Sequence, residues 1–126
     1  PVTNGIPQEF ELTDELYLCP IFTREITPIL SSDYDFSCKN FYSAKLAVEG
    51  TMYARDGWSH PNGSNVVGWV KHYGRSPIVY LQGGDSGAVM EDPNFRRLVH
   101  NAVRWVSSKD ALKWAEDAFE REKSAK

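Results

Sequence analysis

The stretch from residue 66 to residue 106 constrains the fold of this chain more than any other part. It begins with two β-rich runs, "VVGWVKHYG" and "SPIVYLQ", which a tight Gly74-Arg75 connection joins into a predicted hairpin. A glycine-rich turn follows the second run, and an amphipathic helical pattern begins a few residues later. A strand followed by a turn and a helix is typical of α/β proteins. We therefore predict an α/β fold.

The helical pattern after the turn has a clear beginning. Asp92 is a suitable N-cap, and Pro93 suits the first helical position. Ser107-Ser108 interrupts the pattern, and we expect Asp110 to cap a terminal helix within residues 109–126. The apolar stripe of the first helix is formed by Phe95, Leu98, Val99, Ala102 and Val106. The predicted inward positions of the terminal helix are Leu112, Ala115, Ala118 and Phe119.

The first 65 residues show weaker patterns. "ELYLCPIF" mixes aromatic and aliphatic residues, and we interpret it as a buried strand that ends at Pro20. "EITPILSS" is a second strand candidate, in which Pro28 favours an edge position. Residues 33–54 show no clear pattern, and the run "KLAVEGTMYAR", residues 45–55, is compatible with a strand or with a loop. Residues 55–65, "RDGWSHPNGSN", have the Gly, Pro, Asn and Ser content of a long surface loop.

Composition and charge restrict the class of protein. A chain of 126 residues that is 41% hydrophobic is expected to fold as a single domain, residues 1–126, around one core. The net charge of -3 argues against a nucleic-acid partner, which would need a clustered basic face. No apolar run reaches bilayer-spanning length and no signal-peptide pattern opens the chain. We therefore expect a cytoplasmic protein without a membrane partner.

The sequence contains no cofactor-binding motif. Its two cysteines, Cys19 and Cys38, form neither a CxxC metal pair nor a dense disulfide framework, and we interpret them as buried thiols. We therefore assign no cofactor and no metal ligand from the sequence.

The glycine turn contains Gly84-Asp85-Ser86-Gly87, the tetrapeptide that surrounds the nucleophilic serine of chymotrypsin-like proteases. Those proteases are all-β, whereas here a strand precedes the turn and a capped helix follows it. None of the three histidines stands in a protease-like context, and a triad needs a histidine within hydrogen-bond reach of the serine. The sequence therefore predicts a turn. A serine hydrolase that uses Ser86 is the least favoured alternative.

Two other functions of the turn fit less well. The nucleophile elbow of an α/β-hydrolase requires G-x-S-x-G, and the register of the glycines here does not match it. A phosphate cradle would use backbone amides at a helix N-terminus. The carboxylates of Asp85, Glu91 and Asp92 would repel a phosphate, and no lysine follows the glycines as it does in a P-loop.

Two long segments resemble a known family. "GWVKHYGRSPIVYLQGGDSGAVMEDPNFRRLVHNAVRWV" is similar to the closing segment of the ThuA-like (trehalose utilisation) family, where a "VYL" strand and a glycine turn precede a helix ending in "NAxRW". The opening "PVTNGIPQEFELTDELY" resembles an earlier segment with an Asp-Glu-x-Tyr cluster. The resemblance covers most of residues 1–107. It implies a three-layer α/β sandwich similar to class I glutamine amidotransferases. It also implies a role in carbohydrate metabolism, on trehalose, another glycoside or a keto-glycoside.

The chain departs from the family pattern in two respects. Family members carry a preceding half with the first strands of the sheet, so this chain resembles the C-terminal part of such a domain. We therefore expect a homo-oligomer or an association with the missing N-terminal half. Many members also have Gly-His after the "VYL" strand, where this chain has Gly84-Asp85. This departure favours the rival interpretation, a non-catalytic sugar-binding or assembly module with the same fold.

Candidate site residues come from three segments of the sequence. In open parallel sheets, ligands bind beyond the carboxyl ends of the strands, where the glycine turn and the 55–65 loop are expected to lie. The family resemblance adds the Asp-Glu-x-Tyr cluster. We expect Gly84 to let the backbone approach a ligand closely. The predicted cleft is lined by Glu15, Tyr17, Trp58, His60 and Asp85.

We assign a role to each candidate as a hypothesis. Glu15 or Asp85 acts as a base and His60 as its partner in proton transfer, while Tyr17, Trp58 and Gly84 bind the sugar. The alternatives are purely structural roles. Glu15 is then a carboxylate at a strand end, and Trp58 is one buried aromatic residue that anchors its loop.

Overall fold

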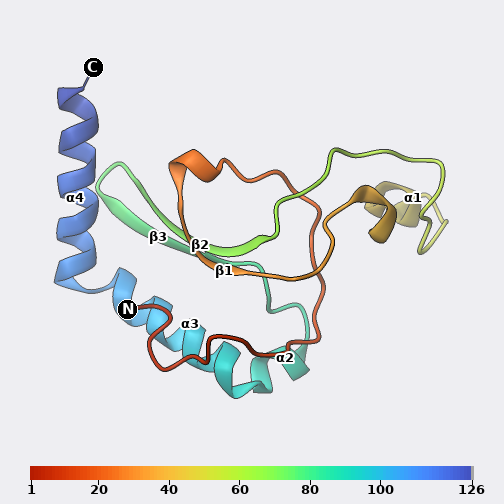
Figure 1. The fold of residues 1–126 in the computed structure, drawn as a ribbon, viewed down its shortest axis with the longest axis horizontal. Coiled ribbons are helices and arrows are strands. Elements are labelled where there is room, and N and C mark those ends of the chain that lie inside the picture. Colours follow the sequence, from red (N-terminus) through yellow and green to blue (C-terminus); the bar gives the residue numbers. More distant parts are fainter. Residues whose placement is uncertain (126) are drawn as a thin grey trace.

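The computed structural model describes residues 1–125, and its strands form one sheet. The strands are β1 (Thr27–Ser31), β2 (Val66–Tyr73) and β3 (Ser76–Leu81), in the spatial order β1-β2-β3 (Figure 1). The α/β class is therefore confirmed. Both strand pairs are antiparallel, which corrects the prediction that the site lies beyond the ends of parallel strands. β2 and β3 form a hairpin, and β1 pairs with β2 at the edge of the sheet. Neither antiparallel pairing needs a helical crossover.

In the described part of the chain, residues 1–125, four α-helices accompany the sheet (Figure 1). They are α1 (Ala44–Val48), α2 (Gly87–Glu91), α3 (Pro93–Val106) and α4 (Lys109–Ser124). Two short 3₁₀ helices cover Thr23–Glu25 and Cys38–Asn40. Within residues 1–125, no helix is both long enough and apolar enough to cross a membrane.

The predicted hairpin is confirmed. β2 and β3 pair from Gly68↔Leu81 to Tyr73↔Ser76, and Gly74, with φ of 54°, forms the turn. That φ value is in the left-handed region, which glycine adopts without steric cost. β1 lies at the edge of the sheet, as Pro28 predicts, because proline has no N–H to donate to a second neighbouring strand.

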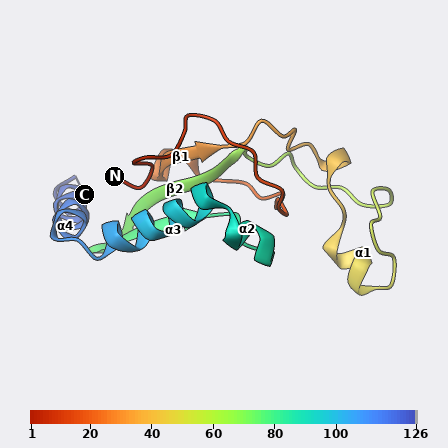
Figure 2. The ribbon, with the colours of Figure 1, turned by 90° about the horizontal axis from the view of Figure 1, so that it is seen from below.

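α3 packs against one face of the sheet and forms the core with it (Figure 2). Its Asp92 cap accepts hydrogen bonds from the backbone N–H groups of Asn94 and Phe95, at 2.9 and 2.8 Å. The buried core cluster contains Val2, Val70, Leu98 and Ala102. Val99, which we predicted to be inward, is exposed instead. The buried stripe of the helix is therefore narrower than predicted, because only Phe95, Leu98 and Ala102 are buried.

α4 begins two residues before the predicted start. Its cap is Ser108, whose hydroxyl accepts a hydrogen bond from the Ala111 N–H at 3.1 Å, while Asp110 lies in the first turn. Leu112 is 49% exposed, so its predicted inward position is wrong. Ala115 and Ala118 are buried as predicted and Ala111 is buried as well, because small side chains allow a close approach to the neighbouring elements.

Two predictions for the first 60 residues are wrong. "ELYLCPIF" is irregular rather than a strand, and Pro20 has no N–H to offer a ladder. "KLAVEGTMYAR" overlaps α1, whose N-cap is Ser43 because the Ser43 hydroxyl accepts a hydrogen bond from the Leu46 N–H at 3.2 Å. Residues 55–65 form a loop as predicted. Cys19 and Cys38 are free and half-buried.

Candidate functional site

The glycine turn after β3 is a structural turn, as predicted. Ser86 is the N-cap of α2, and its hydroxyl accepts a hydrogen bond from the Val89 N–H at 3.3 Å. Within residues 1–125, no histidine forms a hydrogen bond with Ser86. The arrangement is that of a helix cap, and it lacks the histidine base of a serine nucleophile.

Asp14 joins the N-terminal segment to this turn. One of its carboxylate oxygens accepts a hydrogen bond from the Gly84 N–H at 2.7 Å, and the other accepts one from the Glu15 N–H at 2.9 Å. A Cβ atom on Gly83 would lie 2.9 Å from the Asp14 carboxylate and 3.0 Å from the Phe95 ring. Gly83 is therefore required by close packing. The Gly84 N–H, a candidate ligand donor, is used inside the protein.

Gln82 holds the segment that carries Glu15 and Tyr17. This side chain is buried, and its amide oxygen accepts a hydrogen bond from the Tyr17 N–H at 3.3 Å. Its amide nitrogen donates to the Tyr17 carbonyl at 3.4 Å. One side chain thus satisfies both backbone groups of Tyr17, as a neighbouring strand would. The signal for it in the sequence is a polar residue that ends the apolar run "IVYLQ".

Glu15, Tyr17 and Asp85 form an electrostatically coupled group at this turn. The Tyr17 hydroxyl donates a hydrogen bond to the Glu15 carboxylate at 3.3 Å. Desolvation raises the pKa of Tyr17, and the negative charges of Asp85 and Glu15 raise it further. The phenol therefore stays protonated at neutral pH and acts as a donor. The group can offer one hydroxyl donor and two carboxylate acceptors to a ligand.

Trp58 and His60 are positioned differently. Their ring centroids lie 6.5 Å apart, and the His60 ring nitrogen Nδ1 lies 2.7 Å from the Pro61 carbonyl oxygen. The indole N–H of Trp58 is buried and has no hydrogen-bond partner within residues 1–125. The other end of their loop contacts the N-terminal segment, because the Ser64 N–H donates to the Cys19 carbonyl at 3.1 Å. The contacts of the turn group include neither Trp58 nor His60.

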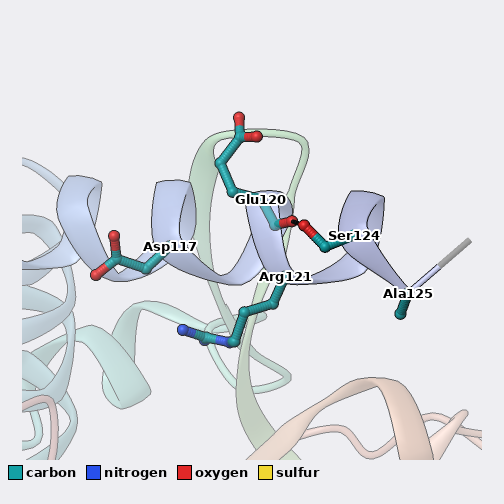
Figure 3. Close-up of a pocket in the computed structure, with 5 residues that line it drawn as sticks. All are labelled: Asp117, Glu120, Arg121, Ser124 and Ala125. Atoms are coloured by element: carbon teal, nitrogen blue, oxygen red, sulfur yellow. Dashed lines mark hydrogen bonds between the residues drawn. The ribbon is translucent and has the colours of Figure 1, made fainter.

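Two surface hollows lie outside this group. The larger, of about 510 Å³, is lined entirely by the last turns of α4, including Asp117, Glu120 and Arg121 (Figure 3). The smaller, of about 160 Å³, lies between residues 20–26 and β2, where Trp69 and Lys71 line it. None of the candidate site residues lines either hollow. Within residues 1–125, no group of three or more His, Cys, Asp or Glu side chains could hold a metal ion.

Comparison with known proteins identifies the family. No curated protein and no solved structure matches the chain. The family model ThuA, described as trehalose utilisation, matches residues 1–106, which include β1, β2, β3 and the whole turn group. A match over most of the chain agrees with the resemblance of its opening and closing segments. The chain belongs to the ThuA (trehalose utilisation) family.

Proposed function

We propose that this chain acts on a sugar or glycoside in carbohydrate metabolism and binds it at the turn group of Glu15, Tyr17 and Asp85. The observation that carries the proposal is that the hydrogen bonds from Gly84 to Asp14 and between Gln82 and Tyr17 hold the Glu15–Tyr17 segment beside the turn that bears Asp85, in a chain of the trehalose utilisation family. The substrate is trehalose, another glycoside or a keto-glycoside.

The turn group suits a neutral ligand with many hydroxyls. Each carboxylate accepts hydrogen bonds from sugar hydroxyls, and a protonated Tyr17 donates one to a ring or glycosidic oxygen. The raised pKa of Tyr17 favours its protonated form at neutral pH, so we propose Glu15 or Asp85 as the base. Tyr17 then orients the substrate or supplies a proton.

Trp58 and His60 complete the proposed site. The 55–65 loop is joined at its end to the segment that follows Tyr17, through the Ser64–Cys19 backbone hydrogen bond. We propose that the loop moves about this joint when a sugar binds, so that the indole covers the sugar ring. The unpartnered indole N–H of Trp58 is then available to a ligand oxygen, and His60 transfers the proton.

The sheet supports a proposal about assembly. Within residues 1–125, β1 and β3 each pair on one side only, so each presents an open edge. An open edge recruits a further strand. We propose that a second copy or a preceding half completes the sheet, as a three-layer sandwich similar to class I glutamine amidotransferases requires. Sedimentation velocity over a dilution series should show concentration-dependent association, and a dilution-resistant monomer would contradict this.

Turnover assays test the proposed site directly. We expect the unmodified protein to convert at least one member of a panel of disaccharides and keto-disaccharides. Asp85→Asn and Glu15→Gln should lower the rate by about 10²-fold or more for the residue that acts as the base. Glu91→Gln, a carboxylate exposed on α2, is the matched control and should leave the rate unchanged.

Ligand-dependent thermal shift separates the enzyme from the rival function. Binding without turnover would favour the non-catalytic sugar-binding module, which Asp85 at the histidine position of the family pattern supports. The absence of both binding and turnover across the panel would contradict both functions.

A further inference from the structure

α1 and the loop after it form a lobe that projects from the sheet, away from α2 (Figures 1 and 2). The two ends of this loop are held together by a backbone hydrogen bond from the Ser43 N–H to the Ala54 carbonyl, at 3.1 Å. The same Ser43 caps α1. This closure places Tyr42 beside Tyr53, and their ring centroids lie 5.2 Å apart with an interplanar angle of 68°. The two rings stand at an angle to each other, and we call the space between their faces the corner.

Tyr53 has an unusual backbone conformation. Its φ of 58° is the only positive φ of a non-glycine residue within residues 1–125. The left-handed region is sterically costly for a residue with a bulky side chain, and glycine would adopt it freely. Such strain persists where it positions a side chain, and it is concentrated at ligand clamps and active sites.

Burial does not explain this strain. Tyr53 is 69% exposed and Tyr42 is 47% exposed, whereas the lobe has its own small core in the buried Phe36 and Phe41 rings. The strained residue therefore turns its ring toward solvent, so the packing of the fold gains little from it. An exposed ring held by a strained backbone points to a ligand.

Arg55 supplies a charge at the same corner. Its guanidinium carbon lies 4.7 Å from the centre of the Tyr42 ring, and its Nη2 donates a hydrogen bond to the Tyr42 hydroxyl at 3.0 Å. Within residues 1–125 the guanidinium forms no ion pair, including with Asp56, the next residue. The contact with Tyr42 fixes the orientation of the guanidinium. Its remaining N–H groups can form a bidentate pair with a carboxylate.

We propose that Tyr42, Tyr53 and Arg55 form a binding platform for an acidic sugar, separate from the turn group. The sugar ring stacks in the corner between the two tyrosine rings, and its carboxylate pairs with the Arg55 guanidinium. A single unpaired cation beside two aromatic rings suits a ligand that has one ring and one negative charge. The protein's net charge of -3 disfavours a polyanionic ligand. The sugar class rests on the proposed function, whereas the platform itself rests on the strain, the ring geometry and the free guanidinium.

Glucuronate, methyl glucoside and acetate test the two parts of the platform. Titration followed by the aromatic NMR signals of the tyrosines should show glucuronate shifting the Tyr42 and Tyr53 signals most. Arg55→Gln should weaken glucuronate binding by about tenfold, as expected for the loss of one charge-assisted pair, and should bring it to the level of methyl glucoside. Arg24→Gln, an exposed arginine elsewhere, is the matched control.

Tyr53→Gly distinguishes a binding role from a structural one. Glycine relieves the strained backbone, so the melting temperature should stay the same or rise while glucuronate binding is lost. Tyr73→Ala, which removes an equally exposed tyrosine from β2, should leave binding unchanged. Unchanged binding in Tyr53→Gly, or an absence of tyrosine signal shifts with glucuronate, would overturn the proposal.

The platform and the turn group can fail independently. Replacing the residue that acts as the base, by Glu15→Gln or Asp85→Asn, should lower turnover by about 10²-fold or more and leave glucuronate binding at the tyrosines unchanged. If no panel sugar is turned over but glucuronate still shifts Tyr53, the proposed function fails and the platform stands. If turnover depends on Glu15 but no sugar shifts Tyr53, only the platform fails.

Discussion

The hairpin with α3 differs from the segment of residues 14–19 in how each is held in place. The hairpin is a backbone ladder closed by one glycine turn, and α3 is capped by the side chain just before it. The 14–19 segment has no ladder. Its position depends on Gln82, 65 residues beyond Tyr17, and on the hydrogen bond between Asp14 and Gly84, 70 residues apart.

This difference separates local from long-range determination of structure. A ladder between neighbouring strands and a cap at a helix end depend on residues close in the sequence, so they form wherever the local pattern is right. A segment held by single side chains from a distant strand forms only after that strand is in place. The turn group is made from the second kind of contact, so the site depends on the hairpin but the hairpin does not depend on the site.

Leu98→Ala should cause the largest loss of stability, because it removes a core side chain from the region of the hairpin and α3. Leu98 is 0% exposed and lies in the core cluster with Val2, Val70 and Ala102. We expect the free energy of unfolding to fall by about 2–5 kcal/mol, through lost burial and the cavity left behind. Urea denaturation measures it. Val103→Ala on the exposed face of α3 is the control, and an equal loss in both variants would contradict this account of the core.

Gln82→Ala should cause a smaller loss of stability. Its structural effect should be greatest in the segment that carries Glu15 and Tyr17. It leaves the N–H of Tyr17 without its partner, at a cost of about 1–3 kcal/mol in the free energy of unfolding, while the Tyr17 carbonyl keeps the hydrogen bond from the Cys19 N–H. Any turnover should fall with it, because Tyr17 and Glu15 lose their position. Amide hydrogen exchange should increase in residues 14–19 and remain slow in β2. Equal deprotection of both segments would show that the two regions are not held separately.

Ser86→Ala should cost about 1 kcal/mol of stability through loss of the α2 cap. Any activity should change by far less than the ~10³-fold expected when a nucleophile is removed. Rate assays and a fluorophosphonate probe measure this. Covalent labelling of Ser86 by the probe would overturn the interpretation as a turn and support a serine hydrolase.

The smallest effect concerns pH and the contact of α4 with the hairpin turn. Arg75 donates to Glu120 at 2.7 Å, and this hydrogen bond lowers the pKa of Glu120 below its ordinary value of 4.5. A lowered folded pKa means that the contribution is fully present above pH 4.5 and is lost as the pH falls through the folded pKa. The melting temperature of Glu120→Gln should therefore converge with that of the unmodified protein at low pH. A difference that grows on acidification would contradict the pairing.

The outcome for the helices shows what local patterns can determine. Asp92-Pro93 predicts the start of α3 correctly, because the cap depends only on the next three residues. The start of α4 is misplaced by two residues, since Ser108 and Asp110 are both capable caps and packing selects between them. The exposure of Val99 and Leu112 has the same origin: helical periodicity defines a stripe, but its width depends on the neighbouring elements.

The sequence by itself determined the hairpin, the Asp92 cap, the glycine turn and the family, because each is encoded in contiguous residues. Tertiary structure alone decided that Asp14 binds Gly84, that Gln82 replaces a strand beside Tyr17, and that Tyr53 adopts a strained backbone beside Tyr42. These contacts join residues without a shared local pattern. They form only when the entropy lost in closing the intervening loop is offset by burial and hydrogen bonds gained elsewhere in the fold. No short stretch of sequence determines that balance.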